Sequence, residues 1–172
     1  ILFAYYLRFY QLNFEDYWID EMLSFYIADP NITLEETLIR QKKLDQNPLL
    51  FNLFLREYFK ILNYDPEIGR HVPFFCGLLA IPLLGVLSYQ VKKESYLLAI
   101  LLFGLSIYLT KYSQETRPYS LIFLLSTINL IFFYKITFSK LNYYQNVFYL
   151  LLFVIFSVLS LSSHPFVIII FF

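Results

Sequence analysis

Four long apolar segments follow one another along most of the chain, and they limit the possible fold more than any motif does. They run from about residue 72 to 90, 96 to 110, 119 to 134 and 147 to 163. Each is apolar around almost its whole circumference, which is typical of helices surrounded by lipid or by other helices. A soluble all-α bundle explains one such segment, but four in succession favour a membrane protein. We therefore predict an all-α integral membrane protein, a multi-spanning helical bundle.

The composition favours the same class. Hydrophobic residues make up 59% of the 172 residues and charged residues 15%, whereas about a quarter of a soluble domain is charged. The formal net charge is zero, so the chain carries no basic surface of the kind that binds nucleic acid. The single cysteine, Cys76, allows no internal disulfide. The lipid bilayer is the expected partner, and nucleic acid is not.

The two ends of the chain lead us to expect a fragment of a longer protein. The chain starts without an initiator Met and stops inside an apolar run at residues 170–172. A cleaved signal peptide is the alternative explanation for the start, but no small-residue cleavage pattern is present. We expect residues 1–14 to be the end of a first span, residues 15–70 an extracytoplasmic loop with juxtamembrane helices, and residues 71–172 further spans.

The short loops between the predicted spans differ in charge. The loops at residues 92–94 and 135–140 carry four lysines, and they are expected on one side of the membrane. The loops at 111–118 and 163–165 carry one lysine and one arginine, and they are expected on the other side with the long loop. Cytoplasmic loops are enriched in basic residues. We therefore expect the first pair in the cytoplasm and the long loop on the periplasmic or extracellular side.

The long loop contains helix signals. Thr33 and Glu36 are spaced as in a capping box, and they predict a helix that runs to about Leu44. Asn47-Pro48 offers a second helix start, with an N-cap residue followed by proline at the first helical position. The loop is therefore expected to be folded.

The second of these helices is predicted over residues 49–62. Asn52, Arg56 and Lys60 recur every four residues and form a polar stripe on an otherwise apolar segment. The segment is too short to span a bilayer, so the stripe favours a helix that lies in the membrane interface. The alternative is a helix packed on a neighbouring soluble domain.

Few residues offer chemistry. The chain has four glycines and no phosphate-binding glycine loop, and His71 and His164 are its only histidines, so no metal-ligand spacing is present. Asp20 and Glu21 follow the predicted first span. Adjacent carboxylates cannot share one face of a helix, so we expect them to meet different partners, one of them as a general base. The alternative is a solvated acidic pair at the membrane boundary.

Two further polar groups lie at predicted helix ends. Residues 112–119 include Arg117, whose planar fork of donors suits a phosphate or a carboxylate. The alternative is that Arg117 only pairs with Glu115. His164 ends the last predicted span, where a histidine is either a participant or an interfacial anchor.

Together these groups resemble a recurring set in the GT-C superfamily of lipid-linked-sugar glycosyltransferases. The resemblance is to the family 39-type relatives of protein mannosyltransferases and of the lipid A aminoarabinose transferase. The family's D-x-H-P-P-L stretch is present with Asn-Pro in place of His-Pro-Pro, and its Y-S-Q-E-x-R-x-Y loop is complete. The matching positions are Trp18 to Glu21, Asp45 to Leu49, Arg70, Tyr112 to Tyr119 and His164.

The resemblance implies transfer of a sugar from a polyprenyl-phosphate sugar donor to a protein or glycolipid acceptor, or to an envelope glycan, on the extracytoplasmic face. It implies a bacterial inner membrane location. Asp20 would be the catalytic base or orient the acceptor, Glu21 would assist it, and Arg117 would hold the donor phosphate. Some relatives use a divalent cation and others do not. The other expected substrate-binding residues are Gln114, Glu115, Tyr119, His164, Asp45 and Arg70.

Two other classes are compatible with this pattern. A transporter or flippase of a lipid-linked substrate would also place an arginine and carboxylates near a membrane face. It should have ionisable groups or broken helices near the bilayer midplane. The predicted spans hold only hydroxyl side chains and Asn129, which favours the enzyme. A non-catalytic membrane subunit is the second alternative, and the intact Asp20-Glu21 pair argues against it.

Overall fold

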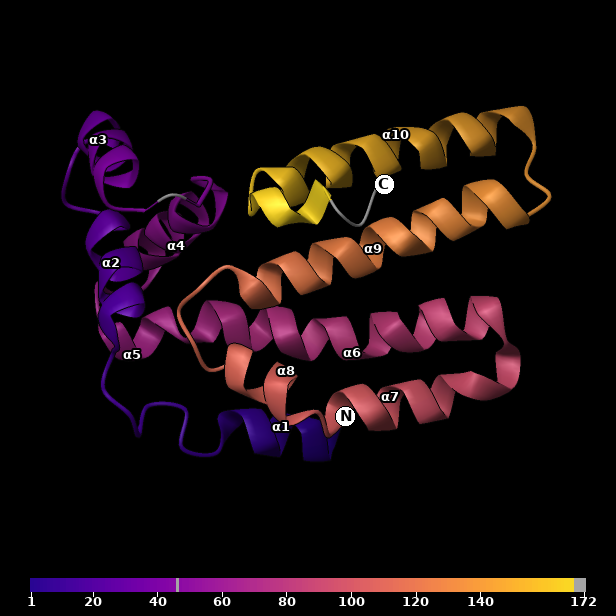
Figure 1. Ribbon diagram of the computed structural model, residues 1–172, viewed down its shortest axis with the longest axis horizontal. Coiled ribbons are helices and arrows are strands. Elements are labelled where there is room, and N and C mark those ends of the chain that lie inside the picture. The colour runs from indigo at the N-terminus through magenta and orange to yellow at the C-terminus, as the bar shows by residue number, and fades with distance from the viewer. Residues whose placement is uncertain (46, 169–172) are drawn as a thin grey trace.

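The computed structural model describes residues 1–45 and 47–168 (Figure 1). These residues form helices and connecting segments, without a β-strand among them. Two sequence predictions lie outside the described residues: the Gln46 position of the Asp45–Leu49 stretch, and the opening of a further span at residues 170–172.

Three helices in the described part of the chain are long and apolar enough to cross a membrane, which indicates a membrane protein. The first joins α5 (Pro66–Gly69) to α6 (His71–Val91), and α6 continues through Pro82. The others are α9 (Tyr119–Phe138) and α10 (Tyr143–Leu161). These correspond to the first, third and fourth predicted spans.

The second predicted span, over residues 96–110, is wrong as a continuous helix. The segment forms α7 (Tyr96–Gly104) and α8 (Ile107–Tyr112), with a break between them. Gly104 has low helix propensity, and the Ser106 side chain caps the first turn of α8. These two residues stop one helix and start another inside an apolar run.

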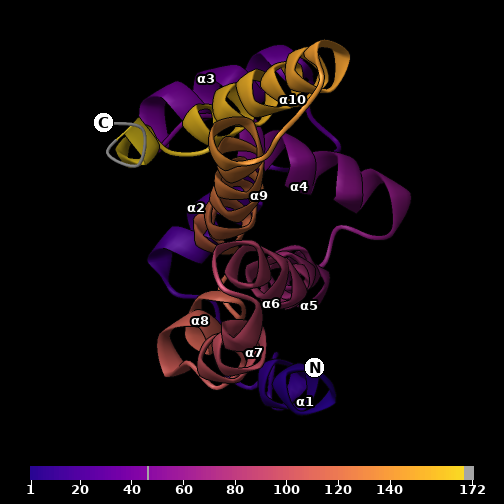
Figure 2. The ribbon, with the colours of Figure 1, turned by 90° about the vertical axis from the view of Figure 1, so that its right-hand side faces the viewer.

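The helices lie in a row. Figures 1 and 2 show α10 beside α9, α9 beside α6, and α6 beside α7, with consecutive members in contact. A buried hydrogen bond from Asn129 Nδ2 to Ser160 Oγ, 3.1 Å long, joins α9 to α10. The arrangement is a single layer with three candidate spans among the described residues, so the predicted multi-spanning bundle is not confirmed.

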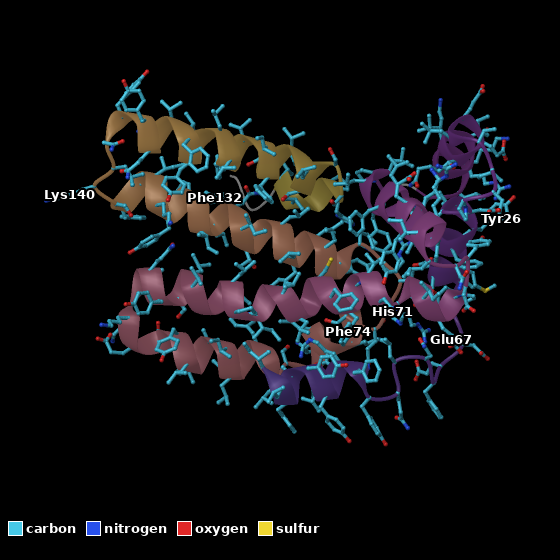
Figure 3. All side chains as sticks on the ribbon, turned by 180° about the vertical axis from the view of Figure 1, so that it is seen from behind. Tyr26, Glu67, His71, Phe74, Phe132 and Lys140 are labelled. Atoms are coloured by element: carbon cyan, nitrogen blue, oxygen red, sulfur yellow. The ribbon has the colours of Figure 1, made fainter. Side chains whose placement is uncertain are left out.

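The connections alternate between the two ends of the row, as predicted. The turn after α6 and the turn after α9 lie at one end, and Lys140 is at that end in Figure 3. Tyr26 and Glu67 are at the opposite end. Which end faces the cytoplasm stays a prediction.

The chain before α6 forms two parts. A short helix, α1 (Leu2–Phe9), lies against α6 and α8. An irregular segment, residues 10–18, then leads to the far end of the row, and we call it the strap. The strap starts with a reversal at Gln11, whose φ is 55°. The helix therefore ends earlier than the predicted boundary of the first span at residue 14.

Three helices then form a unit at the end of the row, here called the end unit: α2 (Ile19–Ile27), α3 (Leu34–Leu44) and α4 (Leu50–Ile61). Thr33 Oγ1 accepts the Glu36 N–H at 3.2 Å and caps α3. The helix predicted from Thr33 to Leu44 is confirmed.

The predicted N-cap of α4 is wrong. The helix starts after Leu49 without a side-chain cap. Asn47 contacts the preceding segment instead, and its backbone N–H and side-chain Nδ2 donate to Asp45 Oδ1 at 3.0 and 2.9 Å. Because the Asn47 side chain binds Asp45, it does not cap the first turn of α4.

The polar stripe of α4 also differs from the interfacial prediction. Asn52 is buried and donates to Gln41 Oε1 at 2.7 Å, and Arg56 is buried and donates to the Ile32 carbonyl at 2.6 Å. Lys60 is the exposed member of the stripe. The stripe therefore packs within the same chain, against Gln41 of α3 and the Ile32 carbonyl that precedes α3, and not on a separate domain. The apolar face of α4 enters a core that comprises Ala28, Phe51, Leu55, Phe59 and Val72.

Candidate functional site

The starts of α2 and α6 meet the loop between α8 and α9 at Glu21. Arg70 Nε lies 3.1 Å from Glu21 Oε1, and Arg70 Nη2 lies 3.0 Å from Oε2. The Thr116 N–H donates to Oε1 at 2.7 Å. Glu21 is 1% exposed, in the first turn of α2, where a negative charge is favourable. Both carboxylate oxygens are therefore engaged within the protein.

Arg70 is also fully engaged. Its Nη1 donates to the carbonyls of Leu12 and Glu15 at 2.9 and 2.7 Å, and Nη2 donates to the Asp16 carbonyl at 3.4 Å. With the two bonds to Glu21, these contacts use all five N–H donors of a guanidinium. Arg70 holds the strap, and no donor remains for the substrate contact that the sequence predicted.

Gln114 holds the beginning of the strap in the same way. Its Nε2 donates to the carbonyls of Arg8 and Tyr10, at 3.0 and 3.1 Å. Tyr17, at the other end of the strap, accepts the Thr116 hydroxyl at 2.7 Å. Burial raises the pKa of the Tyr17 hydroxyl above its ordinary value. The strap is thus tied to the loop that follows α8 at both ends.

A second group of polar contacts forms around Arg117. Its Nη1 lies 3.1 Å from Asp45 Oδ2, and it also donates to Ser24 Oγ and to the Asp20 carbonyl, both at 3.2 Å. Arg117 is 5% exposed. Its Nε is buried and has no hydrogen-bond partner within the described chain. A buried guanidinium with an unused donor is a candidate for binding an anion.

His164 belongs to the same group. Burial lowers the pKa of its imidazole below the ordinary value, and the positive charge of Arg117 lowers it further, while Asp45 acts in the opposite direction. The structure therefore brings the end of α10, the junction of α3 and α4, and the loop before α9 together, as the sequence predicted.

Asp20 differs from its neighbour. Its carboxylate makes no hydrogen bond or ion pair to the residues that the structure describes, whereas its backbone carbonyl accepts from Arg117 and from Ser24. Of the two adjacent carboxylates, which were predicted to meet different partners, Glu21 meets Arg70 and the Thr116 N–H. The roles of the two carboxylates stay a prediction.

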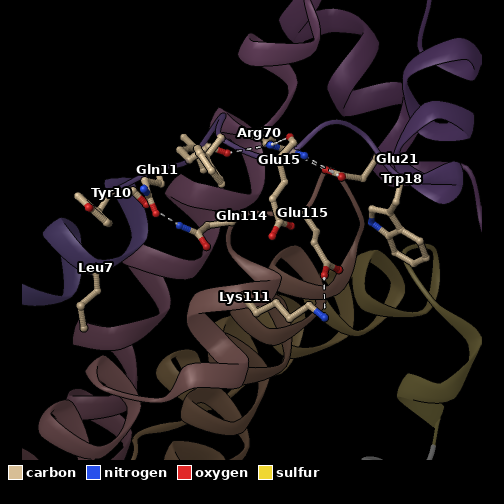
Figure 4. Close-up of a pocket in the computed structure, with 12 residues that line it drawn as sticks. Leu7, Tyr10, Gln11, Glu15, Trp18, Glu21, Arg70, Lys111, Gln114 and Glu115 are labelled. Carbon is tan, nitrogen blue, oxygen red and sulfur yellow. Dashed lines mark hydrogen bonds and ion pairs between the residues drawn. The ribbon is translucent and has the colours of Figure 1, made fainter.

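A cavity of about 440 Å³ lies between the strap and the α8 region (Figure 4). Four of the predicted site residues line it, namely Glu21, Arg70, Gln114 and Glu115. Glu115 is largely buried and lies 3.8 Å from Lys111 Nζ. Burial raises the pKa of Glu115 above its ordinary value, and Lys111 acts in the opposite direction. Asp20, Arg117, Asp45 and His164 are not among the lining residues of this cavity.

An adjoining cavity of about 330 Å³ includes Tyr119, the remaining predicted residue. The two cavities share Glu15, Trp18, Lys111 and Glu115. The predicted residues are thus gathered at one end of the row, but they divide into a cavity-lining set and the group around Arg117.

Sequence reasoning missed several residues, and Arg8 is the most informative. It is fully buried, and its guanidinium donates to the carbonyls of Gly104, Phe103 and Ala4 at 3.0, 3.2 and 3.2 Å. It satisfies the last carbonyls of α7, where a positive charge is favourable. A lone charge inside an apolar run was the available signal. Thr116 and Ser24 carried no such sequence signal. Thr116 contacts Glu21 through its backbone N–H, and Ser24 contacts Arg117 through its hydroxyl.

Within residues 1–45 and 47–168, no three His, Cys, Asp or Glu side chains gather closely enough to hold a metal ion. Comparisons of the chain with models of protein families, with curated proteins and with solved structures gave no match in any of the three.

Proposed function

We propose that this chain is part of a membrane glycosyltransferase of the GT-C type. It would take a sugar from a polyprenyl-phosphate carrier and pass it to a protein, glycolipid or envelope-glycan acceptor on the extracytoplasmic face. One observation carries the proposal: Asp20, whose carboxylate has no partner among the described residues, precedes a carboxylate that is fixed by Arg70, and its own carbonyl contacts the buried Arg117. This proximity supports Asp20 as the base and Arg117 as the phosphate ligand.

In the proposed reaction the acceptor hydroxyl oxygen attacks the anomeric carbon of the sugar. The Asp20 carboxylate takes the hydroxyl proton as the new C–O bond forms. The bond between the anomeric carbon and the phosphate oxygen breaks, and polyprenyl phosphate leaves with an additional negative charge. Arg117 offsets this charge, and its unpartnered Nε supports that role.

Glu21 has a different task in this scheme from the one that the resemblance implied. Its two oxygens accept from Arg70 and from the Thr116 N–H. It fixes the first turn of α2 relative to α6 and to the loop that carries Arg117. It therefore positions Asp20 and does not itself take a proton.

The test is sugar transfer from a labelled polyprenyl-phosphate sugar in membranes that contain the protein. Asp20→Asn should insert normally and lose at least about a hundredfold in rate, the scale expected of a general base. Glu35→Gln, an exposed change in the first turn of α3, is the matched control and should retain full activity. If Asp20→Asn transfers as fast as the parent, the proposed base is wrong and the proposal fails at its central residue.

A transporter of a lipid-linked substrate is the second candidate, and the break between α7 and α8 favours it. Gly85 of α6 faces Ile100, and Gly77 faces Ser113, so the break lies beside the middle of α6. Arg8 binds the carbonyls at that break. Broken helices and buried charges at mid-depth are typical of transporters.

Vesicles that contain the protein distinguish the two candidates. A transporter moves a labelled lipid-linked sugar between the leaflets without any acceptor, and Arg8→Met should reduce that movement. An enzyme shows no such movement, either as the parent protein or as Arg8→Met, but it transfers the sugar when an acceptor is present.

A further inference from the structure

Trp18 is an exposed aromatic residue in a polar setting. It precedes α2 and lies two residues before Asp20, and 47% of its surface is exposed. Among the described residues, its ring packs against no other aromatic ring or cation, and its indole N–H has no hydrogen-bond partner. Nearly half of the surface of this large apolar residue is therefore available to a ligand, together with one polar N–H.

Trp18 lies at the boundary of the two adjoining cavities described above, and Figure 4 shows its ring beside Glu115 and Lys111. In the 330 Å³ cavity it is accompanied by Tyr112 and Tyr119, whose ring centroids are 4.9 Å apart. The remaining lining residues are three carboxylates and one lysine, and none is aliphatic. The volume is at the lower end of the roughly 300–1,000 Å³ typical of small-molecule sites.

The residues that line this cavity favour one part of a lipid-linked sugar over the other two, the hydrocarbon chain and the phosphate. A hydrocarbon chain would remove carboxylates from water without giving them a hydrogen bond, which is costly. A phosphate would face three carboxylates and one lysine, so like charges would repel it. A sugar ring presents C–H groups on its faces and hydroxyl donors around its edge. These match aromatic rings and carboxylate acceptors respectively.

We infer that the cavity bounded by Trp18, Tyr112 and Tyr119 binds the sugar ring of the substrate, with the indole of Trp18 as the stacking surface. The inference rests on the proposed function and adds a separate location for the sugar. Arg117 does not line either cavity, so the sugar and the phosphate are recognised by different groups of residues. Trp18 is the residue before α2 and lies two residues before Asp20, so the sugar site adjoins the proposed base.

Trp18 is the only tryptophan in the 172 residues, so the intrinsic tryptophan fluorescence of the chain reports on this site alone. The chain is placed in lipid nanodiscs and quenched with acrylamide. The probes are polyprenyl phosphate carrying glucose, galactose or mannose, and polyprenyl phosphate without a sugar. Pockets bury most of a ligand's surface, so at least one sugar-bearing lipid should lower the quenching constant at least about twofold. The bare lipid should leave it unchanged.

Brominated lipids test the competing role of Trp18 as an anchor in the membrane interface, where tryptophan is common. They should quench Trp18 weakly if its ring lies in the cavity. Strong quenching by brominated lipids, with no protection by any of the three sugars, would overturn the inference.

Transfer kinetics separate this inference from the proposed function. Trp18→Leu should raise KM for the lipid-linked sugar about fivefold, because a stacked aromatic contact contributes on the order of 1 kcal/mol and about 1.4 kcal/mol corresponds to a factor of ten. Trp18→Phe should restore most of the loss. Tyr144→Leu, a change at an exposed tyrosine in the first turn of α10, is the control. Asp20-dependent transfer with an unchanged KM in Trp18→Leu would refute the sugar site alone. Sugar-dependent protection of Trp18 without any transfer would refute the enzyme alone.

Discussion

Glu21 and Arg70 are 49 residues apart in the chain, yet their side chains form a buried contact through two hydrogen bonds, 3.1 and 3.0 Å long. Because Glu21 also accepts the Thr116 N–H, one carboxylate joins α2, α6 and the loop before α9. The geometry that the proposed function needs therefore depends on a buried pair of charges whose hydrogen bonds lie within the protein.

We expect Glu21→Gln to destabilise the protein strongly, by about 3–5 kcal/mol, because it leaves the Arg70 charge buried without a counter-ion. Asp20→Asn should cost less than about 1 kcal/mol, since that carboxylate lacks a partner and contributes only its charge at the start of a helix. Unfolding of both variants in detergent, followed by circular dichroism, measures the difference. Equal losses of stability would contradict the structural role of Glu21.

Arg8→Met should loosen the junction of α7 and α8. The change removes three donors from the carbonyls of Ala4, Phe103 and Gly104, and an unsatisfied buried acceptor costs about 1–3 kcal/mol. Hydrogen exchange of the amides at residues 105–112 should become faster. Lys140→Met at the opposite end of the row serves as the control. Unchanged exchange at the junction in Arg8→Met would show that α7 does not depend on this contact.

Two glycines of α6 give a matched pair of packing tests. A methyl group at Gly77 would overlap Ser113 Oγ and lie 2.9 Å from Ser113 Cβ, whereas one at Gly85 would meet the flexible end of Ile100 at 2.7 Å. We expect Gly77→Ala to cost about 1–3 kcal/mol through overpacking, and Gly85→Ala to cost less, because Ile100 can rotate. Thermal unfolding measures both, and Ser113→Gly should restore the Gly77→Ala variant. A similar loss at both glycines, or no rescue, would contradict the close approach at Ser113.

His164 should make stability fall in mild acid. Its folded pKa lies below the ordinary value of 6.5, so the unfolded chain takes up the proton first as the pH decreases. The stabilising contribution is complete above pH 6.5 and is lost as the pH falls from there toward the folded pKa. Unfolding temperatures between pH 7.5 and 5 should show this decrease, and His164→Asn should remove part of it. An identical pH profile in His164→Asn would place the titration elsewhere.

The sequence predicted the structure correctly where a local pattern has one structural meaning, as a long apolar run or a helix N-cap has. Apolar runs longer than a soluble helix needs identified α6, α9 and α10, and the Thr33 cap identified the start of α3. The pairing of side chains was not predictable, because it depends on which segments become neighbours. Arg70 was expected to bind substrate, but five contacts within the protein use its donors.

Two other errors have the same origin. The stripe on α4 looked like an interfacial face, because a single sequence does not reveal that Gln41 and the Ile32 carbonyl lie opposite it. The break in the second span depends on Gly104 and Ser106. Neither residue stops a membrane helix by itself, and the buried Arg8 stabilises the broken end.

The strap has a property that follows from how it is held. Arg70 and Gln114 hold the end of α1 and most of the strap through main-chain oxygens, at Arg8, Tyr10, Leu12, Glu15 and Asp16. Tyr17 is the exception, because its hydroxyl accepts from Thr116 and its ring lies 4.9 Å from the Arg70 guanidinium. Every amino acid supplies the same main-chain oxygen, so at these oxygens the course of the strap does not depend on the side chain that each residue carries. The strap residues Phe14, Glu15 and Trp18, which face the cavity, can therefore be exchanged to change what the cavity accepts while the backbone around it keeps its shape. A protein engineer could alter selectivity at these positions without redesigning the scaffold.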